Sequence, residues 1–320
     1  MSDQELLLAV DGGGTKTQAQ VADLTGSVLA RGLGPSSNHH RVGFEEATRA
    51  MTTAIEGALQ HVLGPRSMGK GDGPAWRSVR IVAACFGLAG IDVPEDEAQI
   101  AGWVKAQGIA KEFVVVNDSE LVLAAGTPEG WGVALISGTG SVCLGRTSEG
   151  RTLRVGGWGP LLGDEGSGYQ MALRALRVAT QTADGRASAT ALLQAVLRHW
   201  SLPDPNALIR HVHDAATGQS EIAGLAAVVM NLAARGDAAA VEIVNEAARD
   251  LAKQVDAVVR RLGLDHPPVA LAGGLLRATL RHSLQAEIKS EIGAVHYVVD
   301  PSQGAVVLAR RILAGAKRPS

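Results

Sequence analysis

The sequence predicts an α/β protein made of two related lobes with a cleft between them. Apolar segments of strand length alternate with longer segments whose apolar residues recur every three or four positions. The same order, a three-strand meander followed by βαβ units, occurs twice along the chain and favours mixed sheets covered by helices. The length of 320 residues is also more usual for two domains than for one. Because the two halves share little sequence, the duplication is inferred from element order.

The first half supplies the elements of one lobe. A meander is predicted from three strands, the last two joined by a polar turn: Leu6–Val10, Thr17–Asp23 and Ser27–Leu33. A helix over Phe44–Leu63 follows, with its apolar residues at helical spacing. The remaining elements are a buried strand, a helix that begins at a proline, and a short β-branched strand: Val79–Leu88, Pro94–Gly108 and Phe113–Val116.

The second half repeats this order more loosely. Its meander strands are expected at Gly132–Ser137, Ser141–Arg146 and Arg151–Gly156. Helical stretches follow near 165–183, 188–200, 205–215, 220–235 and 238–262. Two further strands, a helix between them near 280–291 and an apolar final helix complete the chain: Val269–Ala272, His296–Val299 and Ser302–Ala314. We place the first lobe at 1–118, completed by a C-terminal helix in 302–320, and the second at 119–301.

Composition and charge narrow the class of protein. A net charge of −2 gives no electrostatic footprint for nucleic acid or an anionic membrane, and 3% aromatic residues offer few stacking platforms. No apolar run approaches the roughly 20 residues of a membrane span, and the N-terminus lacks the pattern of a secretion signal. Cys85 and Cys143 lie in predicted apolar strands, so we expect both to be buried, reduced thiols. We therefore expect a cytoplasmic protein that binds neither nucleic acid nor membrane.

The segment Asp11–Thr17, directly after the first strand, carries the clearest chemical signal. Its three glycines allow backbone N–H groups to approach an anion without a side chain in the way. The carboxylate of Asp11 would repel a bare phosphate but can hold Mg²⁺ through water. The segment therefore predicts a site for a metal–nucleotide. The alternative is an ordinary glycine-rich hairpin.

A second segment of the same design is Ser137–Ser141, between two strands of the second meander. It combines small residues, free backbone N–H groups and hydroxyl donors on a tight turn. Two such turns, one from each lobe, predict a two-sided clamp for a polyphosphate. The alternative is a pair of unrelated tight turns.

Two further segments follow strands. Asp118 comes at the carboxyl end of the strand at Phe113–Val116, where α/β sheets place reactive groups, and could act as a catalytic base in phosphoryl transfer. Alternatively, it could be the N-cap of the next helix. Ala270–Gly274 ends a strand in paired glycines, against which a purine or ribose could lie.

Together and in this order, these segments resemble the phosphate, base and adenosine elements of the actin–hexokinase–Hsp70 superfamily. Within it, three stretches resemble the branch that contains the N-acetylglucosamine kinases and the BadF/BadG/BcrA/BcrD ATPases: Ser37–His39, Asn117–Asp118 and Gly156–Gly168. The resemblance covers most of the chain and is weakest in the helical region 170–265. It implies a ribonuclease H-like (actin-like ATPase) fold for each lobe.

The resemblance also implies roles for individual residues. Asp11 would hold hydrated Mg²⁺, and Asp118 would be the base for the sugar 6-hydroxyl. The ATP-binding positions would be Gly13, Gly14, Thr15, Lys16, Gly138, Thr139, Gly140, Ala223, Gly273 and Gly274. The sugar-binding positions would be Asn38, Asp118, Ser141, Val142, Gly156, Gly157 and Asp164. Although Lys16 belongs to the phosphate loop, we expect its side chain to point away from the nucleotide.

The implied activity is an ATP- and Mg²⁺-dependent amino-sugar kinase that phosphorylates N-acetylglucosamine on the 6-hydroxyl. Glucosamine and N-acetylmuramic acid are alternative substrates. An alternative from another class is a nucleotide-driven activator of a dehydratase, which would need paired cysteines to hold an iron–sulfur cluster across a dimer. The preferred amino sugar, the nucleotide base and the oligomeric state stay open, and a homodimer is compatible with the helical second lobe.

Other motifs are weaker. Gly64–Gly71 approaches a Walker A loop but has glycine in place of the Mg²⁺-binding Ser or Thr and follows a helix, so we expect a surface loop. His39–His40 and the pair His211 and His213 lack acidic or cysteine partners nearby in the sequence, which argues against metal binding at either.

Overall fold

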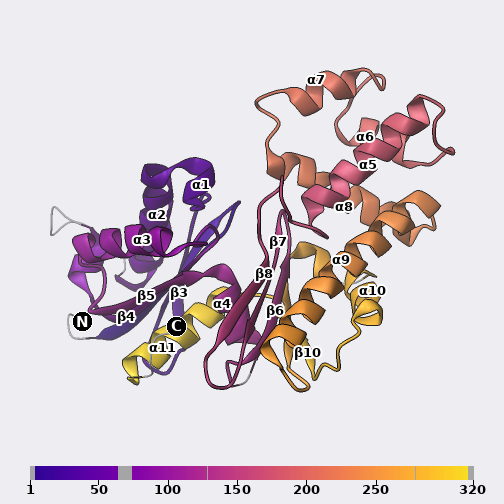
Figure 1. Cartoon of the computed structure of the whole chain (residues 1–320). Helices are drawn as coiled ribbons and strands as arrows, with labels where there is room; N and C mark the ends of the chain where they lie inside the picture. The colour runs from indigo at the N-terminus through magenta and orange to yellow at the C-terminus, as the bar shows by residue number, and fades with distance from the viewer. Residues whose placement is uncertain (1–3, 64–73, 128, 278, 316–320) are drawn as a thin grey trace. The chain divides into compact units, whose positions relative to one another are not determined.

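The computed structural model describes residues 4–63, 74–127, 129–277 and 279–315 (Figure 1). The Walker-like segment Gly64–Gly71 lies outside the described residues. The chain divides into two compact units. The first comprises Met1–Trp131, Ser148–Gly150 and Val298–Ser320, and the second comprises Gly132–Thr147 and Arg151–Tyr297. The lobe boundary placed at 118/119 from the sequence stays a prediction, and by contacts the helix that begins at Asp118 belongs to the first unit.

The first unit is built on a five-stranded mixed sheet of order β3-β2-β1-β4-β5. Its strands are β1 (Glu5–Gly12), β2 (Thr17–Ala22), β3 (Val28–Gly34), β4 (Arg80–Leu88) and β5 (Glu112–Asn117). The strands of the meander pair antiparallel, whereas β1, β4 and β5 run parallel. The carboxyl ends of these three parallel strands therefore meet at one edge of the sheet.

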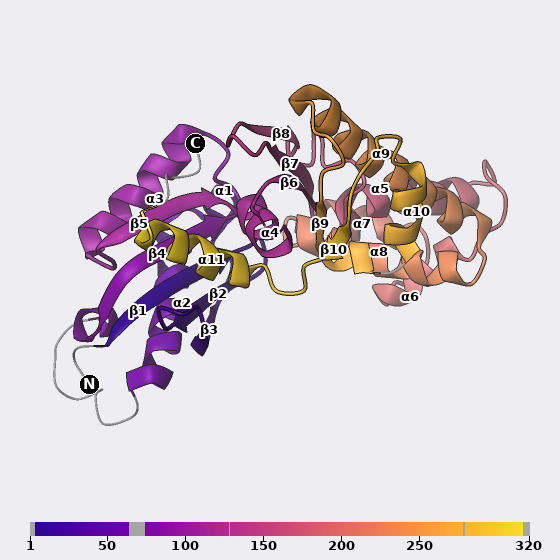
Figure 2. The same ribbon diagram turned by 90° about the horizontal axis from the view of Figure 1, so that it is seen from below.

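Helices cover both faces of this sheet. They are α1 (His39–Val42), α2 (Phe44–Leu63), α3 (Pro94–Gln107), α4 (Asp118–Gly126) and α11 (Ser302–Leu313), with a 3-10 turn at Ala75–Ser78. Alternate residues of β1 point to opposite faces, as a strand requires. Leu6 and Leu8 pack with α2 and α3, while Leu7 and Ala9 pack with α4 and α11. Figure 2 shows α11 lying across the sheet, so that the end of the chain completes the core of the first unit.

The second unit repeats this sheet. Its strands are β6 (Gly132–Ser137), β7 (Ser141–Arg146), β8 (Thr152–Gly156), β9 (Val269–Ala272) and β10 (Val295–Tyr297), in the order β10-β9-β6-β7-β8. Again the meander is antiparallel, and its first strand, β6, pairs parallel with β9, which in turn pairs parallel with β10. Counting from the meander, the two sheets have the same strand order and directions. The predicted two-fold α/β architecture is confirmed.

Helices form a larger share of the second unit than of the first. They are α5 (Gly168–Ala183), α6 (Leu192–His199), α7 (Ala207–His213), α8 (Gln219–Ala234), α9 (Ala238–Leu262) and α10 (Thr279–Glu287), with a 3-10 turn at Gly274–Arg277. The amphipathic helix α9 buries one face against the sheet, and α5, α8 and α10 pack around it. Among the described residues, no single helix is long and apolar enough to cross a membrane; α8 and α9 meet that criterion only as a pair bent by 117°.

Most predicted elements lie within a few residues of the observed ones. The helix α1 was not predicted, because four residues are too few to show a period. The helix expected from 165 begins at Gly168, since the hydroxyl of Ser167 caps it by accepting from the Gln170 N–H. The helix expected near 280–291 ends at Glu287, and the last strand lies at Val295–Tyr297.

Candidate active site

The first glycine-rich loop is the hairpin between β1 and β2. Gly12 pairs with Thr17, and the Gly13 N–H donates to the Lys16 carbonyl at 2.9 Å. A Cβ on Gly12 would lie 2.2 Å from Ser37 Oγ, so only glycine fits there. Thr15 and Lys16 are exposed and Gly13 and Gly14 half-buried, which leaves this part of the loop accessible to a ligand.

The two threonines of the loop differ in their surroundings. The Thr17 hydroxyl is buried and donates to the Pro35 carbonyl at 2.6 Å, so it fixes the turn. Thr15 is exposed and is the hydroxyl available to a bound phosphate. The Gly14 carbonyl accepts a hydrogen bond from Arg41 at 3.2 Å, which holds the far side of the loop.

Asp11 and Asp118 lie at the same edge of the first sheet. Asp11 pairs with Gly87 of β4, and Asp118 directly follows Asn117, which pairs with Leu88. Burial raises the pKa of Asp11 to about 7, with further increases from the charges of Asp118 and Asp300 and a decrease from Lys16. The negative charge of Asp11 is therefore poorly compensated by its surroundings, and a bound divalent cation would compensate it.

The pKa of Asp118 is also raised, to about 6. Burial is the largest cause and the charge of Asp92 adds to it, while backbone N–H groups at the start of α4 lower it. A carboxylate that titrates this close to neutrality is suited to accept a proton. The N-cap of α4 is Asn117, whose Oδ1 accepts from the Ser119 N–H at 3.1 Å, so the alternative that Asp118 caps this helix is wrong.

A third carboxylate, Asp300, was not predicted. It lies just before α11, pairs with Arg31 at 3.2 Å, and accepts from Gln18 and Gln20 at 3.3 and 3.2 Å. Its charge contributes to the raised pKa of Asp11. The sequence around it reads as a loop before a helix, and nothing local links it to the first strand.

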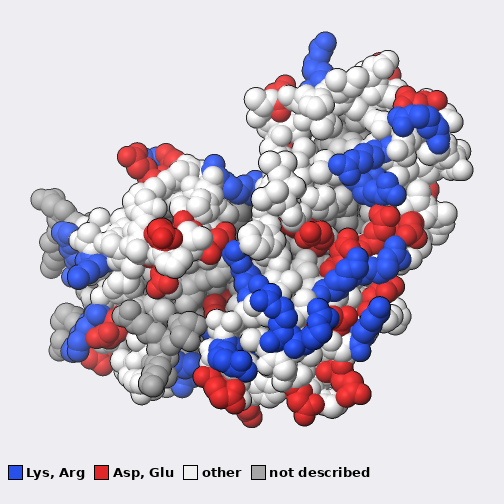
Figure 3. Space-filling model, viewed as in Figure 1, with Lys and Arg blue, Asp and Glu red and all other residues white. Residues whose placement is uncertain are grey.

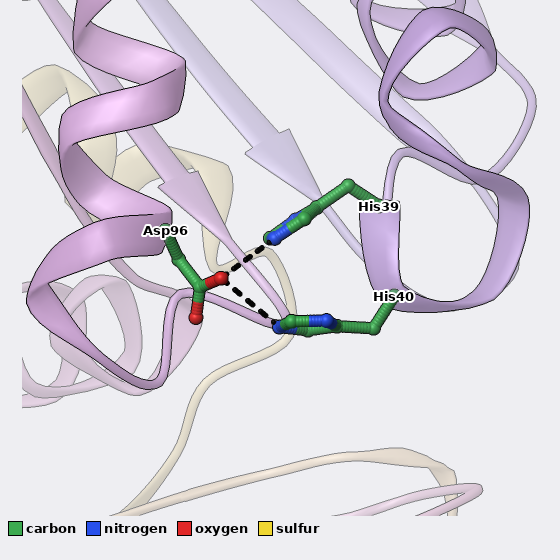
Figure 4. A group of neighbouring side chains, drawn as sticks. All are labelled: His39, His40 and Asp96. Carbon is green, nitrogen blue, oxygen red and sulfur yellow. Dashed lines mark hydrogen bonds and ion pairs between the residues drawn. The ribbon is translucent and has the colours of Figure 1, made fainter.

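A cluster of His39, His40 and Asp96 stands beside the predicted sugar-binding residue Asn38 (Figure 4). Asn38 is the N-cap of α1, and its Oδ1 accepts from the His40 N–H at 3.2 Å. The next two side chains point toward α3: Asp96 Oδ1 lies 2.9 Å from His39 Nε2 and 3.2 Å from His40 Nε2. The expectation that no acidic partner accompanies the two histidines is therefore wrong, because Asp96 is distant only in sequence.

The cluster fits hydrogen bonding better than metal binding. Its three potential ligand atoms lie within 4.8 Å of one another. A metal on His39 Nε2 would put the ring hydrogen on Nδ1, which is buried and has no hydrogen-bond partner among the described residues. Metal-bound histidines normally donate from that nitrogen. With Nε2–H donating to Asp96, Nδ1 carries only a lone pair, which is the less costly arrangement.

In the second unit, the loop Ser137–Ser141 joins β6 and β7. Its Gly138 N–H donates to the Gly140 carbonyl at 2.9 Å. The N–H groups of Gly168 and Tyr169, at the start of α5, donate to the carbonyls of Gly138 and Thr139. A Cβ on Gly138 would meet no atom within 4 Å, so this glycine borders open space.

The predicted adenosine residues surround the same loop. A Cβ on Gly273, whose φ is +101°, would lie 2.0 Å from the Ser137 carbonyl oxygen. The Ala223 carbonyl lies beside Gly168, 3.2 Å from where its Cβ would be, and Gly274 is exposed. The second unit thus brings Gly138, Ala223 and Gly273 together around one turn. Their role in nucleotide binding, which the resemblance implies, stays a prediction.

The predicted sugar-binding residues of the second unit also meet. The Ser141 N–H donates to Asp164 Oδ1 at 3.2 Å, and the Gly157 N–H donates to the Ser141 carbonyl at 3.0 Å. A Cβ on Gly157 would lie 3.0 Å from Val142 Cγ2, and Asp164 is buried at a φ of +59°. The carboxylate of Asp164, the hydroxyl-bearing Ser141 and the backbone of Gly157 therefore lie next to one another in this unit.

Gln254 of α9 belongs to the same group and was not predicted. Its Nε2 donates to the Glu165 carbonyl at 3.2 Å, and its Oε1 is buried without a hydrogen-bond partner among the described residues. A Cβ on Gly156 would lie 2.7 Å from that oxygen. Gln254 lies on the buried face of a long amphipathic helix, where the sequence pattern marks only core positions.

The fold and the paired loops define the class of protein. Two α/β units of the same sheet topology, each with a glycine-rich hairpin after its first strand, are the architecture of the actin-like ATPases and sugar kinases. The chain belongs to the BadF/BadG/BcrA/BcrD ATPase family, whose model matches residues 8–309.

Named relatives and a solved structure agree with this family. An N-acetylmuramic acid/N-acetylglucosamine kinase of Clostridium acetobutylicum is 35% identical over 273 residues, 84% of this chain and 85% of that protein. An N-acetyl-D-glucosamine kinase of Dictyostelium discoideum is 32% identical over 320 residues, 96% and 98% of the two chains. A Chromobacterium violaceum structure described as a candidate N-acetylglucosamine kinase has a TM-score of 0.74 at 27% identity, covering 94% and 98%.

Proposed function

We propose that this protein is an ATP- and Mg²⁺-dependent kinase that transfers the γ-phosphoryl group to the 6-hydroxyl of an amino sugar, N-acetylglucosamine first among them. The observation that carries this proposal is Asp118, a carboxylate of raised pKa at the edge where β1, β4 and β5 end. The glycine-rich loop of the first unit begins at the same edge. The two relatives above, whose names contain this activity, support the choice of substrate.

ATP would bind through backbone groups and small side chains. The phosphates would contact Gly13, Gly14, Thr15 and Lys16 in one unit and Gly138, Thr139 and Gly140 in the other, with the adenosine near Ala223, Gly273 and Gly274. Asp11, whose raised pKa reflects burial and neighbouring negative charge, would hold Mg²⁺ through water. When bound, the cation neutralises charge on the phosphates.

The sugar would be held by carboxylate, amide and hydroxyl groups. Asn38 and Asp118 contribute from the first unit, and Ser141, Val142, Gly156, Gly157 and Asp164 from the second. Asp118 would accept the proton of the 6-hydroxyl while the hydroxyl oxygen attacks the γ-phosphorus and ADP leaves. Because Val142 has no polar side-chain atom, a polar contact to the N-acyl group at this position would come from the backbone.

A substrate panel tests this proposal. Release of ADP from MgATP would be followed with N-acetylglucosamine, N-acetylmuramic acid, glucosamine and glucose, and NMR would locate the phosphate on the product. We expect the highest kcat/KM with an N-acetylated sugar and phosphorylation at the 6-position. Preference for glucosamine would overturn the substrate assignment. Absence of phosphoryl transfer to every sugar would overturn the activity.

N-acetylmuramic acid is the second candidate substrate, because the relative at 35% identity is named for both sugars. The dehydratase-activator alternative is less well supported. Cys85 and Cys143 are buried in β4 and β7, where burial raises the pKa of both thiols, and such thiols are poorly placed to share an exposed cluster across a dimer. A cytoplasmic location and a homodimer stay predictions.

A further inference from the structure

Asp96 is a buried carboxylate with all its hydrogen-bonding capacity committed. It lies in the first turn of α3 and is 7% exposed. Burial by itself raises the pKa of this group, but hydrogen bonds from His39, from the Asp92 N–H, from His40 and from the Val93 N–H lower it to about 2. Asp96 is therefore ionised at neutral pH, and its two oxygens serve two different segments of the chain.

One oxygen holds α1. Asp96 Oδ1 contacts the Nε2 atoms of both His39 and His40 (Figure 4), the first two residues of that helix. The residue before them is Asn38, whose Oδ1 is fixed by the His40 N–H. The orientation of the Asn38 amide therefore depends on where α1 sits, and Asp96 holds α1 from the side.

The other oxygen holds the loop between β4 and α3. Asp96 Oδ2 accepts from the Asp92 and Val93 N–H groups at 3.1 and 3.2 Å. The same loop contacts Asn38 at Gly90, where a Cβ would lie 3.0 Å from Asn38 Oδ1.

The loop also reaches the residue next to Asp118. Asn117 Nδ2 donates to the Ile91 carbonyl at 3.1 Å and to Asp92 Oδ1 at 3.4 Å, while its Oδ1 caps α4. A continuous set of contacts thus connects Asp96 to both Asn38 and Asp118, all within the first unit. The contacts that Asp96 makes with His39 and His40, and those of Asn117 with Ile91 and Asp92, join residues that are distant in the sequence.

We propose that Asp96 is a positioning residue of the active site: through His39 and His40 on one oxygen and the β4–α3 loop on the other, it fixes Asn38 and Asp118 relative to each other. This inference rests on the proposed function, since it takes those two residues as the ones that bind the sugar. Asp96 itself does not contact the substrate in this proposal. Its effect is on the geometry with which the 6-hydroxyl meets its base.

The competing explanation is that Asp96 only caps α3. A carboxylate in the first turn that accepts from the Val93 N–H stabilises the helix whether or not α1 is attached. Asp96→Asn separates the two roles, because the asparagine oxygen can still accept from the Asp92 and Val93 N–H groups. Its amide N–H group then faces the Nε2 atoms of both histidines. His39 could accept from it only by moving its ring hydrogen to Nδ1, which is buried without a partner among the described residues, so the link to α1 is weakened. Asp96→Ala removes both links.

The experiment measures KM for the sugar, KM for MgATP, kcat and thermal midpoint for both variants. Glu97→Gln is the matched control, because it removes one negative charge from the same turn at an exposed position. We expect Asp96→Asn to raise the sugar KM about tenfold and to lower kcat, with KM for MgATP within about twofold of wild type. His39→Gln should reproduce the same pattern, and Glu97→Gln should match wild type.

Equal loss of sugar and ATP affinity in Asp96→Asn, or wild-type kinetics with only a lowered thermal midpoint, would overturn the inference in favour of a helix cap. The wild-type enzyme is measured first in the same assay. If it phosphorylates no sugar, the proposed function fails and not the positioning role. If it is active and the Asp96 variants keep its sugar KM and kcat, the positioning role fails alone.

Discussion

Three aspartates of the first unit show how surroundings decide what a carboxylate can do. Burial raises the pKa of Asp11, Asp118 and Asp96 alike. Asp96 is surrounded by four hydrogen-bond donors, and its pKa falls to about 2, so it is a fixed anion. Asp11 and Asp118 face other carboxylates instead, and their pKa values rise to about 7 and about 6. Charge that is left uncompensated in this way is typical of functional sites.

Asp118→Asn should remove catalysis and leave nucleotide binding. The amide is nearly isosteric but cannot accept a proton, so we expect kcat to fall by about 10²–10⁴-fold. Binding of MgATP, measured by calorimetry, should stay within a few-fold of wild type. Loss of ATP affinity in proportion to turnover would mean that Asp118 serves the nucleotide instead. Asp23→Asn, at an exposed turn in the same unit, is the control.

The pH profile should carry the titration of Asp118. Below pH 6 the carboxyl becomes protonated and can no longer accept the 6-hydroxyl proton, so kcat/KM should fall tenfold per pH unit well below that value. An acid limb at about pH 4, the range of an ordinary aspartate, would contradict the assignment. The measurement needs saturating Mg²⁺, so that metal binding does not add its own pH dependence.

Asp11 should make folding stability depend on pH. Its pKa is raised in the folded state, so the folded protein binds more protons than the unfolded chain between about pH 4 and about pH 7, and stability falls as pH rises across that window. Asp11→Asn removes this loss. The variant should therefore gain stability over wild type at pH 8, by up to about 4 kcal/mol for a shift of about three pKa units, but little at pH 4. Urea unfolding without Mg²⁺ measures it, and a gain that is equal at both pH values would refute the expectation.

Motifs indicate a candidate site residue only where its neighbours in the sequence also suit a nucleotide or sugar site. Asp11, Asp118 and Asn38 stand beside glycines, amides or hydroxyls that identify them. Asp96, Asp300 and Gln254 could not be found in this way. His39 and Asp96 are 57 positions apart and Gln20 and Asp300 280, so only the fold brings each pair together.

At the scale of elements, the glycines of the two hairpins and of the turn after β9 have different tasks. Gly12 and Gly273 are required by the fold, since a Cβ on either would overlap an atom at 2.2 Å or less. Gly138 has open space where its Cβ would be. The sequence marks all three as loop glycines, and only packing separates the structural ones from the accessible one.

Gly138→Ala should fold normally and bind ATP poorly. Its thermal midpoint should equal that of wild type, because the added methyl meets no atom within 4 Å. The KM for MgATP should rise about tenfold if phosphate needs close approach to this backbone. Gly12→Ala is the contrasting variant and should lose about 1–3 kcal/mol of stability through overpacking. An unchanged ATP KM in Gly138→Ala would place the phosphate elsewhere.

At the scale of the whole molecule, the repeated sheet topology was predictable from the sequence. That the first unit is built from both the N-terminal and the C-terminal parts of the chain was only partly predictable. The order of strands and helices along the chain already indicated two similar sheets, and their strand directions agree. On the face of the second unit seen in Figure 3, Lys and Arg side chains form a band with Asp and Glu side chains along its edges, and over the whole chain the two kinds nearly balance at a net charge of −2. Which helices cover which sheet depends on contacts between distant segments, such as α11 against β1 and β4.

Removal of residues 298–320 should unfold the first unit selectively. The helix α11 buries Ala305, Val306, Leu308 and Ala309 against that sheet, and a Cβ on Gly304 would lie 1.9 Å from the Leu121 carbonyl of α4. Hydrogen exchange should show fast exchange in β1–β5 with protection kept in β6–β10. Gly304→Ala, a milder change, should lower stability in the same unit. Equal loss of protection in both units would show that they do not fold independently.

The packing of α11 has a consequence for how the chain is made. Domains generally fold as they leave the ribosome, N-terminal part first. Here the first 131 residues lack one of the helices that close their core until residues 302–313 have been synthesised. The second unit, whose segments end at Tyr297, has all its elements earlier. The unit that begins the chain is therefore the last to be completed, and an unfinished chain exposes the apolar sheet face that α11 will cover.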